Sequence, residues 1–209
     1  EGSTLTQVLL ALVIIIIMSS LILWMVRAFF HIPVARFGVY VQSQIRFNTY
    51  IGLSIMSLLF GAQGMQMFAM MIALAIPLVN VISVLAFSQG QGLKPRQILF
   101  SVIKNPLILG CVVGIIFNLL QLSLFSGLEQ LLKFLASMSL PLGLISVGAA
   151  LQFAQLKHDY MRLLLNTLGR LIGVPCLAYL ICFMLNLNDF ETIILVVFCS
   201  LPTASAAYI

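Results

Sequence analysis

The sequence predicts an all-α integral membrane protein, a bundle of apolar helices that crosses a bilayer several times. Of its 209 residues, 62% are hydrophobic and 7% are charged, whereas a soluble domain carries about 25% charged residues. The apolar runs are continuous, as from Leu9 to Ile17, and do not alternate as the strands of a membrane barrel do. Because backbone polar groups cannot face lipid unpaired, such runs are expected to be helical.

Seven segments are long and apolar enough to span a membrane, or nearly so, since a bilayer core of about 30 Å needs about 20 helical residues. The predicted spans are residues 7–26, a segment ending at 60, then 67–87, 106–124, 128–151, 163–185 and 190–209. Capping patterns mark three helix starts, at Asn105, Ser126 and Asn188. The chain begins without Met, has no signal-peptide flank and ends in an apolar run, so we expect further spans on both sides.

Basic and acidic residues gather in alternate loops. The basic residues follow the first, third and fifth predicted spans and are Arg27, Arg36, Lys94, Arg96, Lys104, Lys157 and Arg162. The opposite ends hold acids, with Lys133 as the one base near that side. Because basic loops stay in the cytoplasm, we expect the first residue outside and the loop around Lys94 inside. The net charge of +5 forms no patch, so we expect no nucleic-acid partner.

The second segment carries polar residues at membrane depth. If it begins near Val39, the polar side chains inside the membrane are Gln42, Ser43, Gln44, Arg46, Asn48 and Thr49. Such groups must face protein or a water-filled cavity. A helix interrupted at Gly52 would expose backbone groups there as well, which is typical of a discontinuous transporter helix. The alternative is an amphipathic surface helix followed by a short, tilted span.

The sixth and seventh predicted spans also hold unusual residues. Residues 200–205 place Pro202 and three hydroxyl side chains in mid-span. Proline removes a backbone donor, so this helix is either broken or kinked, with its hydroxyls bonded to its own backbone. Arg170, in the sixth span, either snorkels to the cytoplasmic surface or pairs with an anion or with a carbonyl freed by a broken helix.

The residue types required for catalysis in a membrane are missing from the predicted spans. No Asp or Glu lies deep in any span, and neither His31 nor His158 does. The four cysteines lie in apolar runs without metal-ligand spacing, and no glycine-rich phosphate loop occurs. We therefore predict no enzymatic activity, no metal and no cofactor.

Small residues four apart recur in two spans, at Gly110 with Gly114 and at Gly169 with Gly173. This spacing lets helix backbones approach closely. In a chain with many spans it favours packing within the chain, and it leaves a homodimer open.

Five sequence blocks carry a family resemblance. They are Phe-Asn-Thr-Tyr-Ile-Gly-Leu at 47–53, Lys-Asn-Pro-Leu-Ile-Leu-Gly at 104–110, and the segments 140–151, 170–175 and 201–204. In these blocks and their order the chain resembles the auxin efflux carrier family of permeases. That family includes plant auxin exporters and bacterial transporters described as malonate or organic-acid carriers.

The resemblance implies ten spans in two inverted five-helix repeats, with crossed discontinuous helices at the fourth and ninth. Residues 1–87 would be the rest of the first repeat, with three spans. Residues 88–105 would be a cytoplasmic connector, and 106–209 an incomplete second repeat with four spans. Many members have a proline just after the glycine of the first crossing, where this chain has Ser54, which suggests a softer break. A bacterial inner membrane is the implied location.

The resemblance also implies a secondary transporter that moves small organic anions across the lipid bilayer by alternating access. Half-helix ends offer free N–H groups and positive dipole ends to a carboxylate near midplane. The candidate substrate-binding residues are Arg46, Asn48, Thr49, Gly52, Arg170, Pro202, Thr203 and Ser205. One rival is a seven-helix receptor or sensor. It would require a retinal-type lysine in the seventh span or receptor motifs after the third span, and the sequence has neither. A channel is the other, and the sequence leaves it open.

Overall fold

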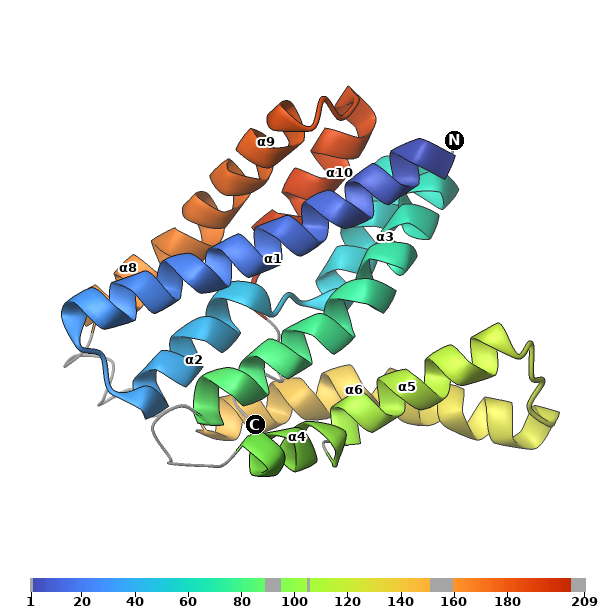
Figure 1. The fold of residues 1–209 in the computed structure, drawn as a ribbon. Helices are drawn as coiled ribbons and strands as arrows, with labels where there is room; N and C mark the ends of the chain where they lie inside the picture. Colours follow the sequence, from blue (N-terminus) through green and yellow to red (C-terminus); the bar gives the residue numbers. More distant parts are fainter. Residues whose placement is uncertain (1, 89–94, 105, 151–159, 204–209) are drawn as a thin grey trace.

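The computed structural model describes residues 2–88, 95–104, 106–150 and 160–203 (Figure 1). Every regular element within these ranges is a helix, which confirms the predicted all-α class. The elements are α1 (Gly2–Phe30), α2 (Val34–Ile45), α3 (Thr49–Ser88), α4 (Pro95–Ile103), α5 (Pro106–Leu119), α6 (Ser126–Ala150), α8 (Tyr160–Leu168), the π-helix η1 (Gly169–Gly173), α9 (Val174–Met184) and α10 (Asp189–Ser200).

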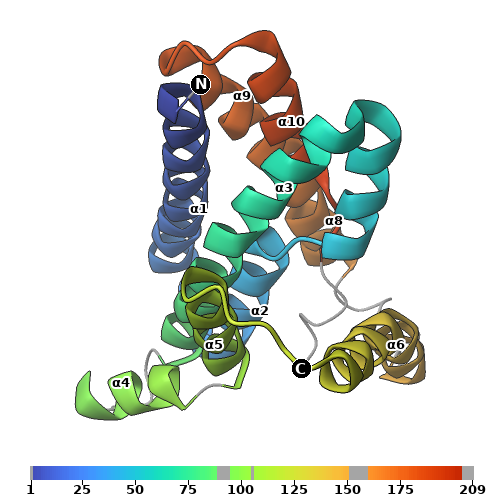
Figure 2. The same ribbon diagram turned by 90° about the vertical axis from the view of Figure 1, so that its right-hand side faces the viewer.

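Helix α3 consists of two helices joined at Gly61. This residue has φ 58° and ψ −145°, a conformation that only glycine adopts without strain. A straight helix of this length would reach about 60 Å, twice the thickness of a bilayer core. Instead α3 turns back on itself, as Figure 2 shows. The predicted boundary between the second and third spans, after residue 60, is thereby confirmed.

A bundle of α1, α2, α3, α9 and α10 encloses the core (Figures 1 and 2). Its largest fully buried side chains include Leu12, Ile15, Phe37, Met56, Phe68, Met71, Ile194 and Leu195. Helix α5 contacts α3 and α4, whereas α6 lies apart from the bundle in Figure 2.

The outer faces of the helices are strongly apolar. Leu58, Phe29 and Phe183 are 85%, 79% and 74% exposed, and many other large apolar side chains are exposed as well. Such extended apolar surface is typical of membrane contact. Within the described ranges, the helices at Leu5–Phe30, Ile51–Ser88 and Tyr160–Met184 are long and apolar enough to cross a membrane. The count of seven spans and the inverted repeats stay predictions.

Several helix boundaries differ from the predicted ones: α1 extends beyond the predicted 7–26 at both ends, and α10 ends at Ser200 within the predicted span 190–209. Helix α5 ends earlier than predicted, shortly before Gln121, whose positive φ of 50° stops a helix. Ser126 is the first residue of α6 and not its cap, since the Phe125 carbonyl accepts from the first free N–H groups. The cap at Asn188 is confirmed, because its Oδ1 accepts from the Glu191 backbone N–H at 2.9 Å. Asn105 lies outside the described residues.

The two ends of the bundle differ in charge. Figure 1 shows the start of α1 beside the α9–α10 turn, and the α1–α2 connection with the start of α8 at the opposite end. Arg36 and Arg162 therefore share one end and Asp189 lies at the other, as the loop alternation predicts. Lys133, the exception, pairs with Glu129 at 2.5 Å. Which end faces the cytoplasm stays a prediction.

Candidate functional site

Two helix interruptions meet inside the bundle. Helix α2 ends at Ile45, and the chain is extended at Arg46 (φ −80°, ψ 135°) before α3 begins at Thr49. Helix α10 ends at Ser200, and Leu201 is extended at φ −61° and ψ 140°. The backbone N–H of Asn48 donates to the Pro202 carbonyl at 2.9 Å, so the two interruptions touch.

The broken-helix interpretation of both polar segments is therefore the correct one. The first segment is not a surface helix followed by a span, because its break is buried between helices: Phe47 and Asn48 are 5% and 8% exposed. The second does not run through Pro202 as a kinked helix. Its hydroxyl groups have different kinds of partner. Ser200 Oγ donates to the Val196 carbonyl of its own helix, whereas Thr203 Oγ1 donates to the Ser43 carbonyl of the other segment at 2.8 Å.

The predicted break at Gly52 is wrong, because Gly52 lies in the first turns of α3 and its N–H donates to the Asn48 carbonyl at 3.0 Å. Glycine inside a helix costs only about 1 kcal/mol, so it need not interrupt one. A Cβ atom at Gly52 would lie 2.2 Å from Phe68 Cζ and 2.7 Å from Leu201 Cδ1. Gly52 is thus needed for close packing of α3 against the end of α10.

Arg170 holds the two interruptions together. Its side chain is 5% exposed, so the prediction that it snorkels to the surface is wrong. Nε and Nη2 donate to the Leu201 carbonyl at 3.1 and 2.9 Å, and Nη1 donates to the Gln44 carbonyl at 2.5 Å. Both carbonyls lie at the C-terminal ends of helices, which carry partial negative charge and lack intrahelical donors. Arg170 therefore pairs with the carbonyls that the broken helices free.

A second polar network ties α2 to α8 beside the crossing. Gln44 Nε2 donates to the Asn166 backbone carbonyl at 2.6 Å and to Asn166 Oδ1 at 3.0 Å. Asn166 Nδ2 donates to Ser43 Oγ at 2.7 Å. A Cβ atom on Gly169 would lie 2.9 Å from Gln44 Nε2, so this glycine leaves room for the Gln44 side chain, whereas a Cβ atom on Gly173 would meet nothing within 4 Å in the described part of the chain. The close approach of helix backbones predicted for this glycine motif is therefore not seen among the described residues.

The second glycine motif, at Gly110 and Gly114 on α5, has open space around both residues within the ranges that the structure describes. A Cβ atom on Gly110 or on Gly114 would meet nothing within 4 Å in the described part of the chain. These two residues therefore do not bring helix backbones together there.

The N-terminus of α3 lies at the crossing. Asn48 Oδ1 accepts from the Ile51 N–H at 3.1 Å and so caps the helix. Thr49, the first helical residue, is partly exposed beside it. Arg46 Nη2 donates to Asn80 Oδ1 at 3.0 Å, which directs the guanidinium group toward the second half of α3. A positive helix end and a cation thus lie within three residues of each other.

An aromatic cluster supports the crossing from the apolar side. The Phe47 and Phe198 ring centroids are 4.4 Å apart, and those of Phe68 and Phe198 are 5.5 Å apart. Leu201 is 1% exposed between the segments. Aromatic pairs of this kind add about 0.5–1.5 kcal/mol each beyond their buried area, which fixes the position of the extended residues.

The structure brings most of the predicted site residues together. Seven lie at or beside the crossing: Arg46, Asn48, Thr49, Gly52, Arg170, Pro202 and Thr203. Ser205 lies outside the described residues.

Sequence reasoning missed two members of the site and one buried acid. Gln44 was predicted to lie at membrane depth but not to belong to the site, and Asn166 was not singled out, although it precedes Arg170 by four residues and so shares its helix face. Glu191 is only 4% exposed despite its place at a helix start, and its Oε2 has no hydrogen-bond partner among the described residues. No group of three or more potential metal ligands lies together in the residues that the structure describes.

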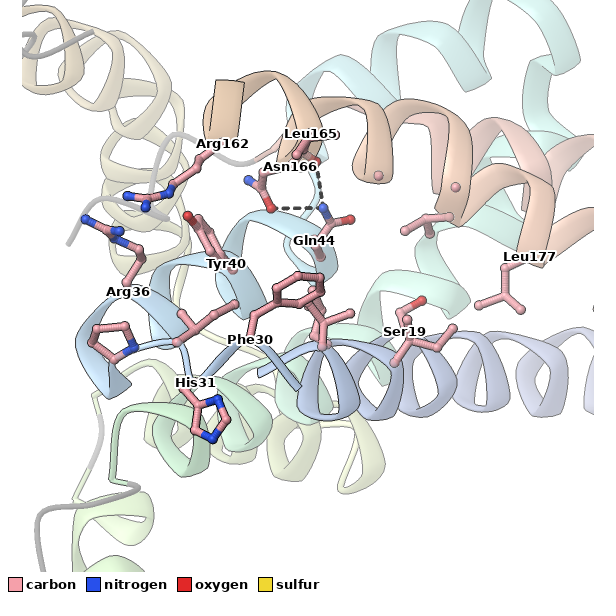
Figure 3. Close-up of a pocket in the computed structure, with 18 residues that line it drawn as sticks. Ser19, Phe30, His31, Arg36, Tyr40, Gln44, Arg162, Leu165, Asn166 and Leu177 are labelled. Carbon is pink, nitrogen blue, oxygen red and sulfur yellow. Dashed lines mark hydrogen bonds between the residues drawn. The ribbon is translucent and has the colours of Figure 1, made fainter. Parts of the chain in front are cut away.

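A cavity of about 820 Å³ lies between α1, α2 and the α8–α9 segment (Figure 3). None of the predicted substrate-binding residues lines it. Gln44 and Asn166 belong to its wall and also to the network beside the crossing, so they separate the cavity from the site.

Comparison with known protein families matches residues 93–209 to the family described as membrane transport protein. The match covers more than half of the chain and includes Arg170 and the interruption after α10. No curated protein and no solved structure matches the chain. The resemblance to the auxin efflux carriers is confirmed, since they belong to this family. The chain therefore belongs to the membrane transport protein family of auxin efflux carriers, and it is an integral membrane transporter.

Proposed function

We propose that the protein is a secondary transporter of small organic anions, and that it binds the anion where α3 begins beside the end of α10. The observation that carries this proposal is the hydrogen bond from the Asn48 N–H to the Pro202 carbonyl. It brings the positive end of α3 and the polar segment after α10 to one place. Lipid tolerates such irregular backbone only where it is buried in protein or lines an aqueous cavity.

The two arginines have different roles in this proposal. The guanidinium group of Arg170 is committed to two carbonyls at negative helix ends. Arg46 donates to the Asn80 side-chain oxygen and lies two residues before Asn48, beside the start of α3. We therefore assign the charge that attracts a carboxylate to Arg46 and a positioning role to Arg170.

The remaining site residues supply hydrogen bonds and space. The side-chain oxygen of Asn48 caps α3, and its amide nitrogen is the group of this residue that can donate to an anion. Thr49 adds a hydroxyl group, and Ser205 would extend this set. The Thr203 hydroxyl donates to the Ser43 carbonyl, so Thr203 acts here by holding the two segments together. Gly52 keeps the backbones close. Inverted repeats that rock against each other around this point would give alternating access in a bacterial inner membrane.

Uptake into proteoliposomes tests the proposed function. We expect saturable uptake of radiolabelled carboxylates, from a panel of acetate, malonate and succinate, and no uptake of amines of similar size. A rate that rises linearly with concentration without saturation would indicate a channel. Equal uptake of amines and carboxylates would contradict anion selectivity.

Two substitutions locate the site. Asn48→Ala removes a polar group beside the proposed anion, so it should weaken apparent affinity by about ten- to a hundredfold, as expected for a lost hydrogen bond to a charged group. Thr203→Ala removes the hydrogen bond to the Ser43 carbonyl that holds the two segments together, so it should also weaken apparent affinity. Thr167→Ala, on the exposed face of α8, is the matched control and should leave uptake unchanged. Normal uptake by both crossing variants would place the site elsewhere.

A further inference from the structure

The cavity beside the crossing has a basic rim. Arg36 and Arg162, both exposed, line it from α2 and α8. Figure 3 shows their side chains directed toward the same place, with the Tyr40 ring next to them. Both arginines also interact within the chain, and a guanidinium group, with five N–H donors, can bind more than one group at a time.

The interior of the cavity is mainly apolar. Its apolar lining includes Ile22, Leu23, Val26, Leu165, Val174 and Leu177. A volume of about 820 Å³ lies at the upper end of the 300–1,000 Å³ that is typical of sites for drug-sized ligands. A carboxylate of three or four carbons would fill little of it and would leave the apolar wall wet. The lining therefore fits a ligand with an anionic head and a long apolar part.

The depth of the rim in the membrane indicates which ligand this is. Arg36 lies just beyond the end of the candidate span Leu5–Phe30, and Arg162 lies in the first turn of the candidate span Tyr160–Met184. Both guanidinium groups therefore sit where lipid headgroups lie. Guanidinium groups bind phosphate oxygens in pairs, and basic pockets between helices bind anionic headgroups.

We propose that this cavity binds an anionic phospholipid, with its phosphate between Arg36 and Arg162 and an acyl chain along Leu23 and Leu177. The site is separate from the substrate site and does not depend on the proposed function. Its occupant would contact Gln44 and Asn166, which tie α2 to α8. A bound lipid would therefore stabilise the packing that holds the crossing in place.

Native mass spectrometry of the purified protein, titrated with phosphatidylglycerol, tests this proposal. The double variant Arg36→Gln with Arg162→Gln should bind phosphatidylglycerol at least about tenfold more weakly, whereas binding of phosphatidylcholine should not change. Arg96→Gln, an exposed arginine on α4 outside the cavity, is the matched control and should bind as the parent protein does. The corresponding double lysine variant keeps both charges and should retain part of the binding, even if the glutamine variant is poorly folded.

Two further measurements separate a lipid from a free anion. Leu23→Trp fills the apolar interior and should weaken phosphatidylglycerol binding, and soluble glycerol phosphate should not displace the lipid. Equal lipid binding by the double glutamine variant and the Arg96→Gln control would overturn the site. If glycerol phosphate displaces bound phosphatidylglycerol at concentrations as low as those at which the lipid itself binds, the rim binds a free anion instead. This result would overturn the lipid assignment.

Discussion

Removing Arg170 should weaken the fold before it affects transport. Arg170→Ala deletes three hydrogen bonds and leaves the buried carbonyls of Leu201 and Gln44 without these donors. A buried polar group that loses its partner costs about 1–3 kcal/mol, so two of them cost about 2–6 kcal/mol. Because a whole domain is stable by only about 5–15 kcal/mol, a loss of this size should lower the melting temperature markedly.

Thermal unfolding of the purified protein in detergent measures this effect. Arg96→Ala is the control, since it removes an exposed arginine on α4 away from the crossing and from the cavity, and its melting temperature should be close to that of the parent protein. Arg170→Lys should recover only part of the lost stability. A lysine presents a point charge and cannot reproduce the planar fork that reaches both carbonyls.

The opposite result would refute the assignment of roles. If Arg170→Ala melts as the parent protein does but no longer binds carboxylates, Arg170 supplies the substrate charge and the crossing is held by other contacts. In that case Arg46→Gln should have little effect on binding, so the two variants together decide between the arginines.

Two further predictions concern packing and orientation. Gly52→Ala forces a methyl group against Phe68 and should destabilise the protein by about 1–3 kcal/mol in thermal unfolding, whereas Gly110→Ala, which has open space, should not; equal melting temperatures would contradict the packing role. In a background without native cysteines, Ser123→Cys should react with an impermeant thiol reagent on intact cells and Ala35→Cys should not. The reverse labelling pattern would overturn the orientation.

The existence of both helix breaks could be predicted from the sequence, because lipid selects strongly against polar backbone. The polar residues around Asn48 and the proline at position 202 point to a break at that depth, although a surface helix and a kinked helix were the alternatives that the sequence left open. The turn before the third span also follows from length, since one helix could not cover both segments within a bilayer. These inferences need only local composition and the dimensions of the membrane.

The exact place of the first break and the partners of Arg170 could not be predicted. A glycine such as Gly52 is tolerated in a helix at small cost, so its presence alone does not distinguish a break from a close contact with a distant side chain. Arg170 donates to backbone carbonyls. Because every residue has a backbone carbonyl, the sequence does not show which of them Arg170 binds. The burial of Glu191 likewise depends on how α9, α10 and the rest of the bundle pack, which local patterns do not reveal.

The affinity of the Asn48→Asp variant for the best-bound carboxylate of the panel tests the central claim most directly. Aspartate caps a helix as well as asparagine does, so the bond to the Ile51 N–H and the melting temperature should be kept. The substitution places a negative charge at the proposed anion site, so isothermal titration should show binding weakened by at least about tenfold, or about 1.4 kcal/mol. Unchanged affinity in a variant of unchanged stability would show that the anion does not bind where the interrupted helices cross.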